Sequence, residues 1–78
     1  MTHTYTFTRE PLTEDAPYLY YVRAVHNGKD EAHLNLFDSA LRGHNKDRLE
    51  RWLGHDAMAA LLLHGTPAIV ERGDPITF

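Results

Sequence analysis

The residues best suited to acid–base or metal chemistry in this chain are its six histidines, and their spacing does not bring them to one point. His55 and His64 are nine positions apart, which places them on opposite sides of a continuous helix, and His26 and His33 are separated along a predicted hairpin. A tetrahedral zinc site needs its ligands at ~2 Å from a common centre, and the chain contains no cysteine. We therefore expect neither a metal site nor a cofactor.

Nucleophilic catalysis has an equally weak basis. Ser39 is the only serine, with Asp38 and His44 near it in the sequence, but a catalytic triad requires the histidine to contact the hydroxyl and the aspartate to orient the histidine. Proximity along the chain does not supply that geometry. The carboxylate pairs Glu14-Asp15 and Asp30-Glu31 lie in predicted turns or at their edges, and neighbouring side chains in extended chain point to opposite sides. We expect a protein that is not an enzyme.

One basic cluster precedes and enters a predicted helix. Such a cluster can hold a phosphate or the acidic surface of a partner. Because Asp47 and Glu50 are interleaved with it, a solvated helix face explains the same residues. The net charge of −3 also disfavours general nucleic-acid binding, which needs a basic surface. The cluster consists of Arg42, Lys46, Arg48 and Arg51, together with His44.

The elements that position these residues begin with two sequence patterns. Thr2 to Thr8 alternates threonine with histidine, tyrosine and phenylalanine, which is the period of a half-buried strand with inward aromatic side chains. Between Pro17 and Phe37, two runs rich in tyrosine, valine and leucine flank Asn27-Gly28, the dipeptide typical of a type I′ turn. The second pattern predicts a β-hairpin with strands at about 18–26 and 29–37.

The pairing within this hairpin decides which side chains share a face. With a two-residue loop, Leu34 lies opposite Tyr21 and Leu36 opposite Leu19, whereas a three-residue loop moves the side chains of one strand to the other face. In either register both faces carry large apolar side chains. In the first register one face combines Tyr18, Tyr20, Val22 and Ala24 with His33, Asn35 and Phe37.

The rest of the chain predicts one helix and one further strand. The predicted helix spans 46 to 64, after Asn45 as N-cap and before Gly65, which suits a helix C-terminus. Its stripe at the i, i+3, i+4, i+7 spacing comprises Leu49, Trp52, Leu53, Ala57, Ala60, Leu61 and His64. Gly54 could divide this helix, but the apolar stripe, which ends at His64, stays in phase across it, and we predict one helix. A strand follows at 68–72. The predicted fold is α+β, a four-stranded and mostly antiparallel sheet with one amphipathic helix on one face, in the order β-β-β-α-β.

Composition limits the class of protein. A chain of 78 residues, 42% of them apolar, predicts a single globular domain over 1–78. A core of this size typically leaves ~3–5 kcal/mol of net stability. No apolar run approaches the ~20 residues of a membrane span, and the first residues lack the pattern of a signal peptide. We expect a cytoplasmic protein that does not bind membranes.

The sheet face without a helix indicates how such a protein could act. Tyr18, Tyr20, Val22 and Phe37 are left on it, either hydrated or packed against a second protein. The favoured hypothesis is a protein-binding module, in which Asp30 and Glu31 at the hairpin tip contact a basic groove of the partner. The alternatives are a homodimer through the open face and, less favoured, a nucleic-acid-binding protein that uses the basic cluster. The sequence leaves the hairpin register and the oligomeric state open.

The layout as a whole resembles a group of known proteins. A threonine-alternating strand (TYTFT), a proline-containing connection, a hairpin that turns at HNGK and an amphipathic helix come in succession, and a GTP turn leads into the strand AIVER. This succession is similar to that of several small phage-encoded inhibitors, among them the anti-CRISPR proteins. The resemblance implies a non-catalytic protein that occupies a functional surface of a bacterial CRISPR effector complex in the host cytoplasm. It carries no diagnostic motif and implies no site residues.

Overall fold

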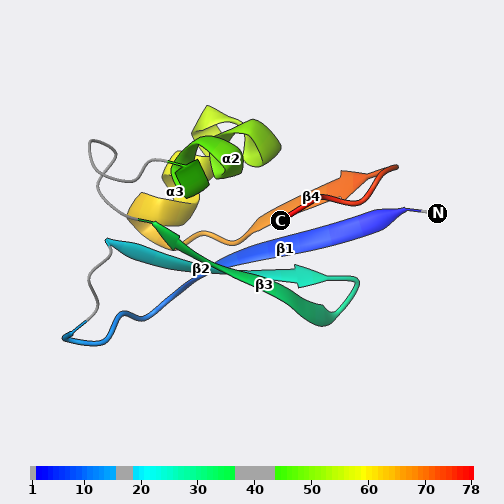
Figure 1. Ribbon diagram of the computed structural model, residues 1–78. Coiled ribbons are helices and arrows are strands. Elements are labelled where there is room, and N and C mark those ends of the chain that lie inside the picture. Colours follow the sequence, from blue (N-terminus) through cyan, green and yellow to red (C-terminus); the bar gives the residue numbers. More distant parts are fainter. Residues whose placement is uncertain (1, 16–18, 37–43) are drawn as a thin grey trace.

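The computed structural model describes residues 2–15, 19–36 and 44–78, which form one sheet and two helices (Figure 1). The sheet is antiparallel and four-stranded, in the order β3-β2-β1-β4. Both helices lie on the same side of it (Figure 1). The predicted α+β class and four-stranded antiparallel sheet are confirmed. The elements are β1 His3–Glu10, β2 Tyr20–His26, β3 Lys29–Leu36, α2 His44–Leu53, α3 His55–His64 and β4 Ala68–Arg72.

The predicted turn at Asn27-Gly28 joins β2 to β3. Both residues have positive φ, 50° and 84°, as a type I′ turn requires. The turn is also fastened to the neighbouring strand, because the Asn27 amide donates to the Thr4 carbonyl at 2.8 Å and the Thr4 amide donates to Asn27 Oδ1 at 2.9 Å. Asparagine is therefore suited to this position both by its tolerance of positive φ and by its side-chain acceptor.

A β-bulge in β3 decides which face each hairpin side chain occupies. Next to the turn the strands keep the register of a two-residue loop as far as Val25 opposite Asp30, but the next pair is Ala24 with Ala32. Glu31 is therefore an extra residue in β3. Beyond it, even-numbered residues of both strands share one face. These are Tyr20, Val22 and Ala24 of β2 with Ala32, Leu34 and Leu36 of β3.

The bulge gathers the aliphatic side chains of the hairpin on the face that the helices cover. Val22 and Ala24 are fully buried, and Leu34 and Leu36 nearly so. The predicted grouping of Val22 with His33 and Asn35 is wrong, because the extra residue moves the β3 leucines to the side of Val22. The rest of the core comprises Tyr5, Phe7, Leu49, Met58, Leu61, Leu62, Ala68 and Ile76.

Gly54 divides the predicted single helix into α2 and α3. Its φ of 90° and ψ of 161° belong to a region that is essentially restricted to glycine. Because the break turns α3 relative to α2, Met58 and Leu62 are buried although they lie outside the predicted stripe, whereas His64 is exposed. The prediction of one helix over 46–64 is therefore wrong. Gly65, with φ 71°, ends α3 as predicted, and its amide donates to the Leu61 carbonyl at 3.0 Å.

Side chains of α2 attach this helix to the sheet and to the C-terminal segment. The Asn45 side-chain amide donates to the Asn35 carbonyl at 2.8 Å, so Asn45 lies in the first turn of α2 and not at the predicted N-cap. Arg48 donates to the Thr77 carbonyl at 3.2 Å, and its guanidinium lies 5.2 Å from the centre of the Trp52 ring. These contacts attach the start of α2 to β3 and its middle to the segment that follows β4.

The C-terminal segment closes one end of the core. The buried amide of Ile76 donates to the Tyr5 hydroxyl at 2.7 Å, and the Phe78 ring lies 5.1 Å from that of Trp52 and 6.0 Å from that of Tyr5. Neither described helix is long and apolar enough to cross a membrane.

Candidate protein-binding surfaces

No group of three or more His, Cys, Asp or Glu side chains in the described ranges is placed to hold a metal ion. The nearest approach is at the hairpin end of the sheet, where His3 Nδ1 lies 2.9 Å from His26 Nε2 and His26 Nδ1 lies 3.5 Å from Glu31 Oε2. Both ring nitrogens of His26 therefore face neighbouring side chains. Its ring also stacks on Tyr5, with 4.3 Å between the ring centres. We interpret this cluster as a structural fastening of β1 to the hairpin.

The exposed aromatic face predicted from the sequence is described only in part, since Tyr18 and Phe37 lie outside the described residues. Val22 is fully buried beneath the helices. The prediction that it contacts a partner is therefore wrong, and the β3 bulge is the reason. Tyr20 is half-buried and packs against the core from the helix side, so it does not lie on the open face either.

The sheet face opposite the helices is largely polar in the described part of the chain. At its centre the buried Nε of Arg23 lies 3.3 Å from Glu10 Oε1 and 3.7 Å from Asp30 Oδ1. The Tyr21 ring meets the His33 ring edge-on, with 5.2 Å between their centres. This is the hydrated face that the sequence left as an alternative. The register places on it Thr4, Thr6, Thr8, Glu10, Tyr21, Arg23, Val25, Asp30, His33, Asn35, Ile69 and Glu71.

Asp30 and Glu31 are exposed at the tip of the hairpin, as predicted from their place next to the turn. Because of the bulge, the two side chains point to opposite faces of the sheet. Asp30 turns to the open face toward Arg23, and Glu31 turns toward His26, which stacks on the buried Tyr5. The side chain of Asp30 is 64% exposed, and ion pairs at this exposure typically contribute only ~0–1 kcal/mol. A partner can therefore replace these pairs at little cost.

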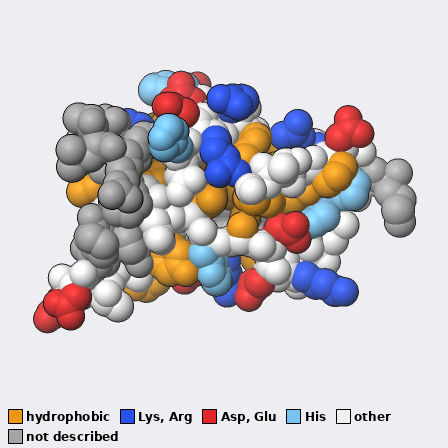
Figure 2. All heavy atoms as spheres, viewed as in Figure 1, with side chains coloured by type: hydrophobic (Ala, Val, Ile, Leu, Met, Phe, Trp, Pro, Cys, Tyr) orange, Lys and Arg blue, Asp and Glu red, His pale blue; other side chains and the backbone are white. Residues whose placement is uncertain are grey.

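The helices and the strands each carry equal numbers of basic and acidic residues, so the acidic excess of the described chain lies in the connections, at Glu14, Asp15 and Asp74. The helices carry three basic residues (Lys46, Arg48, Arg51) and three acidic residues (Asp47, Glu50, Asp56), and red and blue side chains alternate over them in Figure 2. The described residues outside the helices have four basic residues (Arg9, Arg23, Lys29, Arg72) and seven acidic ones (Glu10, Glu14, Asp15, Asp30, Glu31, Glu71, Asp74). The excess of three acidic residues equals the net charge of −3.

The predicted basic cluster is not a free cationic surface within the described chain. Arg48 is engaged with the Thr77 carbonyl and the Trp52 ring. Lys46 and Arg51 remain on α2, interleaved with acidic residues, and Arg42 lies outside the described residues. The structure supports the solvated helix face that the sequence offered as the alternative.

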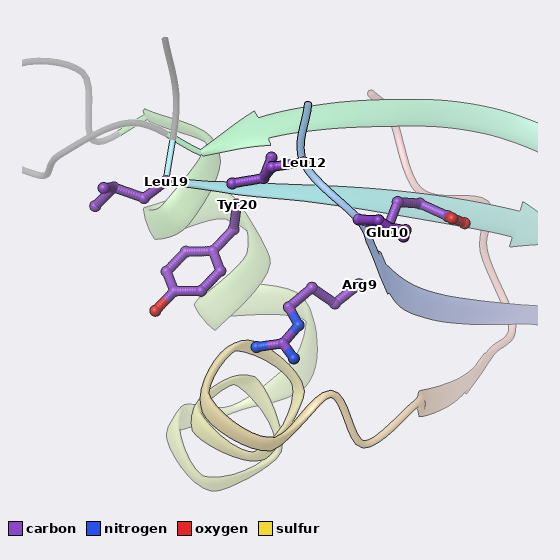
Figure 3. Close-up of a pocket in the computed structure, with 6 residues that line it drawn as sticks. Arg9, Glu10, Leu12, Leu19 and Tyr20 are labelled. Carbon is purple, nitrogen blue, oxygen red and sulfur yellow. The ribbon is translucent and has the colours of Figure 1, made fainter. Parts of the chain in front are cut away.

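A shallow apolar hollow lies between the end of β1 and the start of β2 (Figure 3). Its volume is about 260 Å³, which is below the ~300–1,000 Å³ of typical small-molecule sites. Leu12 and Leu19 at its rim are 42% and 56% exposed. Arg9 turns toward the helices in Figure 3 and donates to the Leu62 carbonyl at 2.6 Å. This hollow was not predicted from the sequence, where its only signal was the apolar Leu12 within a polar connection.

Comparisons of this chain with protein-family models, with curated proteins and with solved structures found no match.

Proposed function

We propose that this domain is a non-catalytic protein-binding module that inserts its acidic hairpin tip into a basic, nucleic-acid-binding groove of a protein partner. The observation that supports this proposal is the pair of exposed carboxylates at the hairpin tip, Asp30 and Glu31, whose ion pairs with Arg23 and His26 are long and partly exposed. Carboxylates compete with phosphates for arginine and lysine side chains, with which both form charge-assisted hydrogen bonds. An acidic projection can thus take the place of a nucleic-acid backbone.

The shape of the tip suits a groove with two basic walls. The turn at Asn27-Gly28 is narrow, and the bulge directs the carboxylates of Asp30 and Glu31 to opposite sides of the hairpin. Each carboxylate can meet an arginine or lysine on its own wall.

A bacterial CRISPR effector complex is the partner that we propose. Such a complex holds its guide–target heteroduplex in a positively charged channel, which is a groove of the required kind, and the layout of the chain resembles phage-encoded inhibitors. On this proposal the protein is an inhibitor encoded by a phage and acts in the cytoplasm of the host cell. It needs no cofactor, since it blocks a surface and transforms no substrate.

Binding to purified CRISPR effector complexes, measured by biolayer interferometry with and without target DNA, tests the proposal. We expect D30K/E31K to weaken binding at least about tenfold and saturating target DNA to compete with the wild-type protein. The matched control is D47K/E50K, which makes the same change in charge on α2 and should bind as the wild type does. Circular dichroism confirms that each variant is folded.

Two results would contradict the proposal in different ways. Equal binding by D30K/E31K and the wild type would rule out the hairpin tip as the contact surface. Failure of every effector complex to bind would rule out the CRISPR partner. The same pair of variants would then be used to capture proteins from a bacterial lysate. The binding-module proposal would end if no protein is captured by both the wild type and D47K/E50K and lost with D30K/E31K.

A further inference from the structure

The two edges of the sheet differ in their protection against pairing with another strand. Along β3 a bulge, three successive charged residues from Lys29 to Glu31, and the Asn45 side chain on the Asn35 carbonyl all hinder a further strand. β4 has none of these, since its pairing with β1 is regular over all five residues and it contains no lysine. Within the described ranges no strand lies on the other side of β4.

The backbone groups on the free side of β4 belong to Ile69 and Glu71. The Asn27 amide donates to the Thr4 carbonyl across β1 and β2, so even-numbered residues of β1 turn their amides and carbonyls toward β2 and odd-numbered ones toward β4. Val70 is paired with Tyr5, an odd-numbered residue. Even-numbered residues of β4 therefore bond to β1, and the amides and carbonyls of Ile69 and Glu71 face away from the sheet.

The side chains of β4 add an apolar contact at the same edge. Ile69 is 69% exposed, the highest value among the exposed large hydrophobic side chains in the described part of the chain. Hydrophobic side chains also gather over the region of β4 in Figure 2. On the helix side Val70 is half-buried. A strand added at this edge would cover both residues, one on each face of the sheet.

We propose that β4 pairs antiparallel with β4 of a second copy of this chain, about a twofold axis through Ile69. In this register the two exposed isoleucines are direct neighbours and exchange both backbone hydrogen bonds, Ala68 lies opposite Val70, and Glu71 lies opposite Pro67. An axis through Glu71 would place two carboxylates opposite each other, and an axis through Val70 would place Ile69 opposite Glu71. The Glu71 amide can donate to the Pro67 carbonyl, whereas proline has no amide to donate in return. The register through Ile69 is thus the one that avoids opposed carboxylates and pairs the exposed isoleucines.

The dimer joins two four-stranded sheets into one continuous sheet with all four helices on the same side. Because the contact is one short strand, it is smaller than the ~1,200–2,000 Å² of stable interfaces. We expect a weak association with half of the chains dimeric at roughly 100 µM. The surface is independent of the hairpin tip, since β3 and β4 are opposite edges of the sheet.

Sedimentation equilibrium from about 10 µM to about 1 mM tests this interface with three variants. Ile69→Lys adds a charge at the edge, and Ile69→Pro removes an amide that the fold itself does not use. We expect each to raise the dimer dissociation constant at least about tenfold. Leu63→Lys is the matched control, because Leu63 is 65% exposed but lies on α3, and it should dimerise as the wild type does.

Each outcome decides the proposal. A wild-type chain that stays monomeric at the highest concentration overturns it, as does a dimer that persists in both Ile69 variants or that Leu63→Lys disrupts equally. Urea unfolding shows whether Ile69→Pro is folded, and Ile69→Lys carries the test if it is not. Amide chemical shifts provide a second measurement, and dilution should move those of Ile69 and Glu71 while those of Asp30 and Glu31 stay constant.

Discussion

Replacing Gly54 by alanine tests the break between α2 and α3, because a broken and a continuous helix give stability changes of opposite sign. At φ 90° and ψ 161° a residue other than glycine is strained by on the order of 1–3 kcal/mol. A Cβ added to Gly54 meets no atom within 4 Å, so backbone strain and not a clash sets the cost. We expect Gly54→Ala to lower the free energy of unfolding by ~1–3 kcal/mol. In a continuous helix it would raise that free energy by ~0.8–1 kcal/mol.

Urea unfolding is a suitable assay because the expected loss is a large part of the ~3–5 kcal/mol typical of so small a domain. With a denaturant slope of ~1 kcal/mol/M for a small chain, the midpoint should fall by about 1–3 M. Trp52 is the only tryptophan in the sequence and directly precedes Leu53 and the break at Gly54. The centre of its ring lies 6.1 Å from that of Phe7 and 5.1 Å from that of Phe78. Its fluorescence reports on core packing, and far-ultraviolet circular dichroism reports separately on the helices.

Gly73→Ala is the matched control for this experiment. Gly73 also has no atom within 4 Å of an added Cβ, but its φ lies outside the left-handed region. Its substitution should change the free energy of unfolding by less than ~0.5 kcal/mol. A higher urea midpoint for Gly54→Ala than for the wild type would refute the broken helix, and equal effects of the two substitutions would refute the assignment of the cost to strain.

Three further predictions concern hydrogen bonds of the sheet and the C-terminal segment. Tyr5→Phe removes the acceptor of the buried Ile76 amide, so it should cost ~1–3 kcal/mol in urea unfolding and speed the hydrogen exchange of that amide, and unchanged exchange would contradict the bond. Asn27→Ala loses both a residue that tolerates φ 50° and the acceptor for Thr4, so a loss of ~1–2 kcal/mol is expected; Asn27→Gly should recover part of it, and equal losses would show that φ is unimportant. Arg48→Ala breaks an exposed hydrogen bond, so thermal unfolding should show less than ~1.5 kcal/mol of destabilisation, and a larger loss would contradict the exposure of this bond to solvent.

Local signals predicted the strands well, because each depends on residues adjacent in the sequence. The alternation from Thr2 to Thr8 and the Asn27-Gly28 dipeptide need no tertiary information, and the strands they predict differ from β1, β2 and β3 by at most two residues at each end within the described ranges. The Gly65-x-Pro67 turn likewise places β4 at Ala68–Arg72 as predicted. These features are decided by backbone φ and side-chain period alone.

The sheet face that each hairpin side chain occupies could not be predicted in the same way. One extra residue in a strand moves every side chain beyond it to the other face. Asp30 and Glu31 are both charged and near a turn, so neither residue type shows which of them is the extra one. The bulge follows from tertiary packing, which favours a register in which Val22, Leu34 and Leu36 all meet the helices. Of the contact residues predicted from the sequence, Tyr20 and Val22 turn to the helix side with the register, whereas Asp30 and Glu31 stay exposed at the tip.

Gly54 illustrates a second limit of sequence patterns. The apolar spacing is compatible with one helix, and glycine within a helix costs only ~1 kcal/mol relative to alanine. Dividing the helix buries Met58 and Leu62 in addition to Leu61, and this burial exceeds that cost. A stripe that stays in phase is thus weak evidence of continuity wherever it contains a glycine.

The position of β1 between β2 and β4 has a consequence for how the chain folds during synthesis. β1, β2 and β3 are consecutive and can pair as soon as they leave the ribosome, but β4 is made about thirty residues after β3 ends, which is a few seconds at ~5–20 residues per second. During this interval the odd-numbered amides of β1 have no strand to bond, and Tyr5 and Phe7 gain their cover only as the helices are completed. The central strand of the finished sheet is therefore an edge strand in the nascent chain until β4 is made.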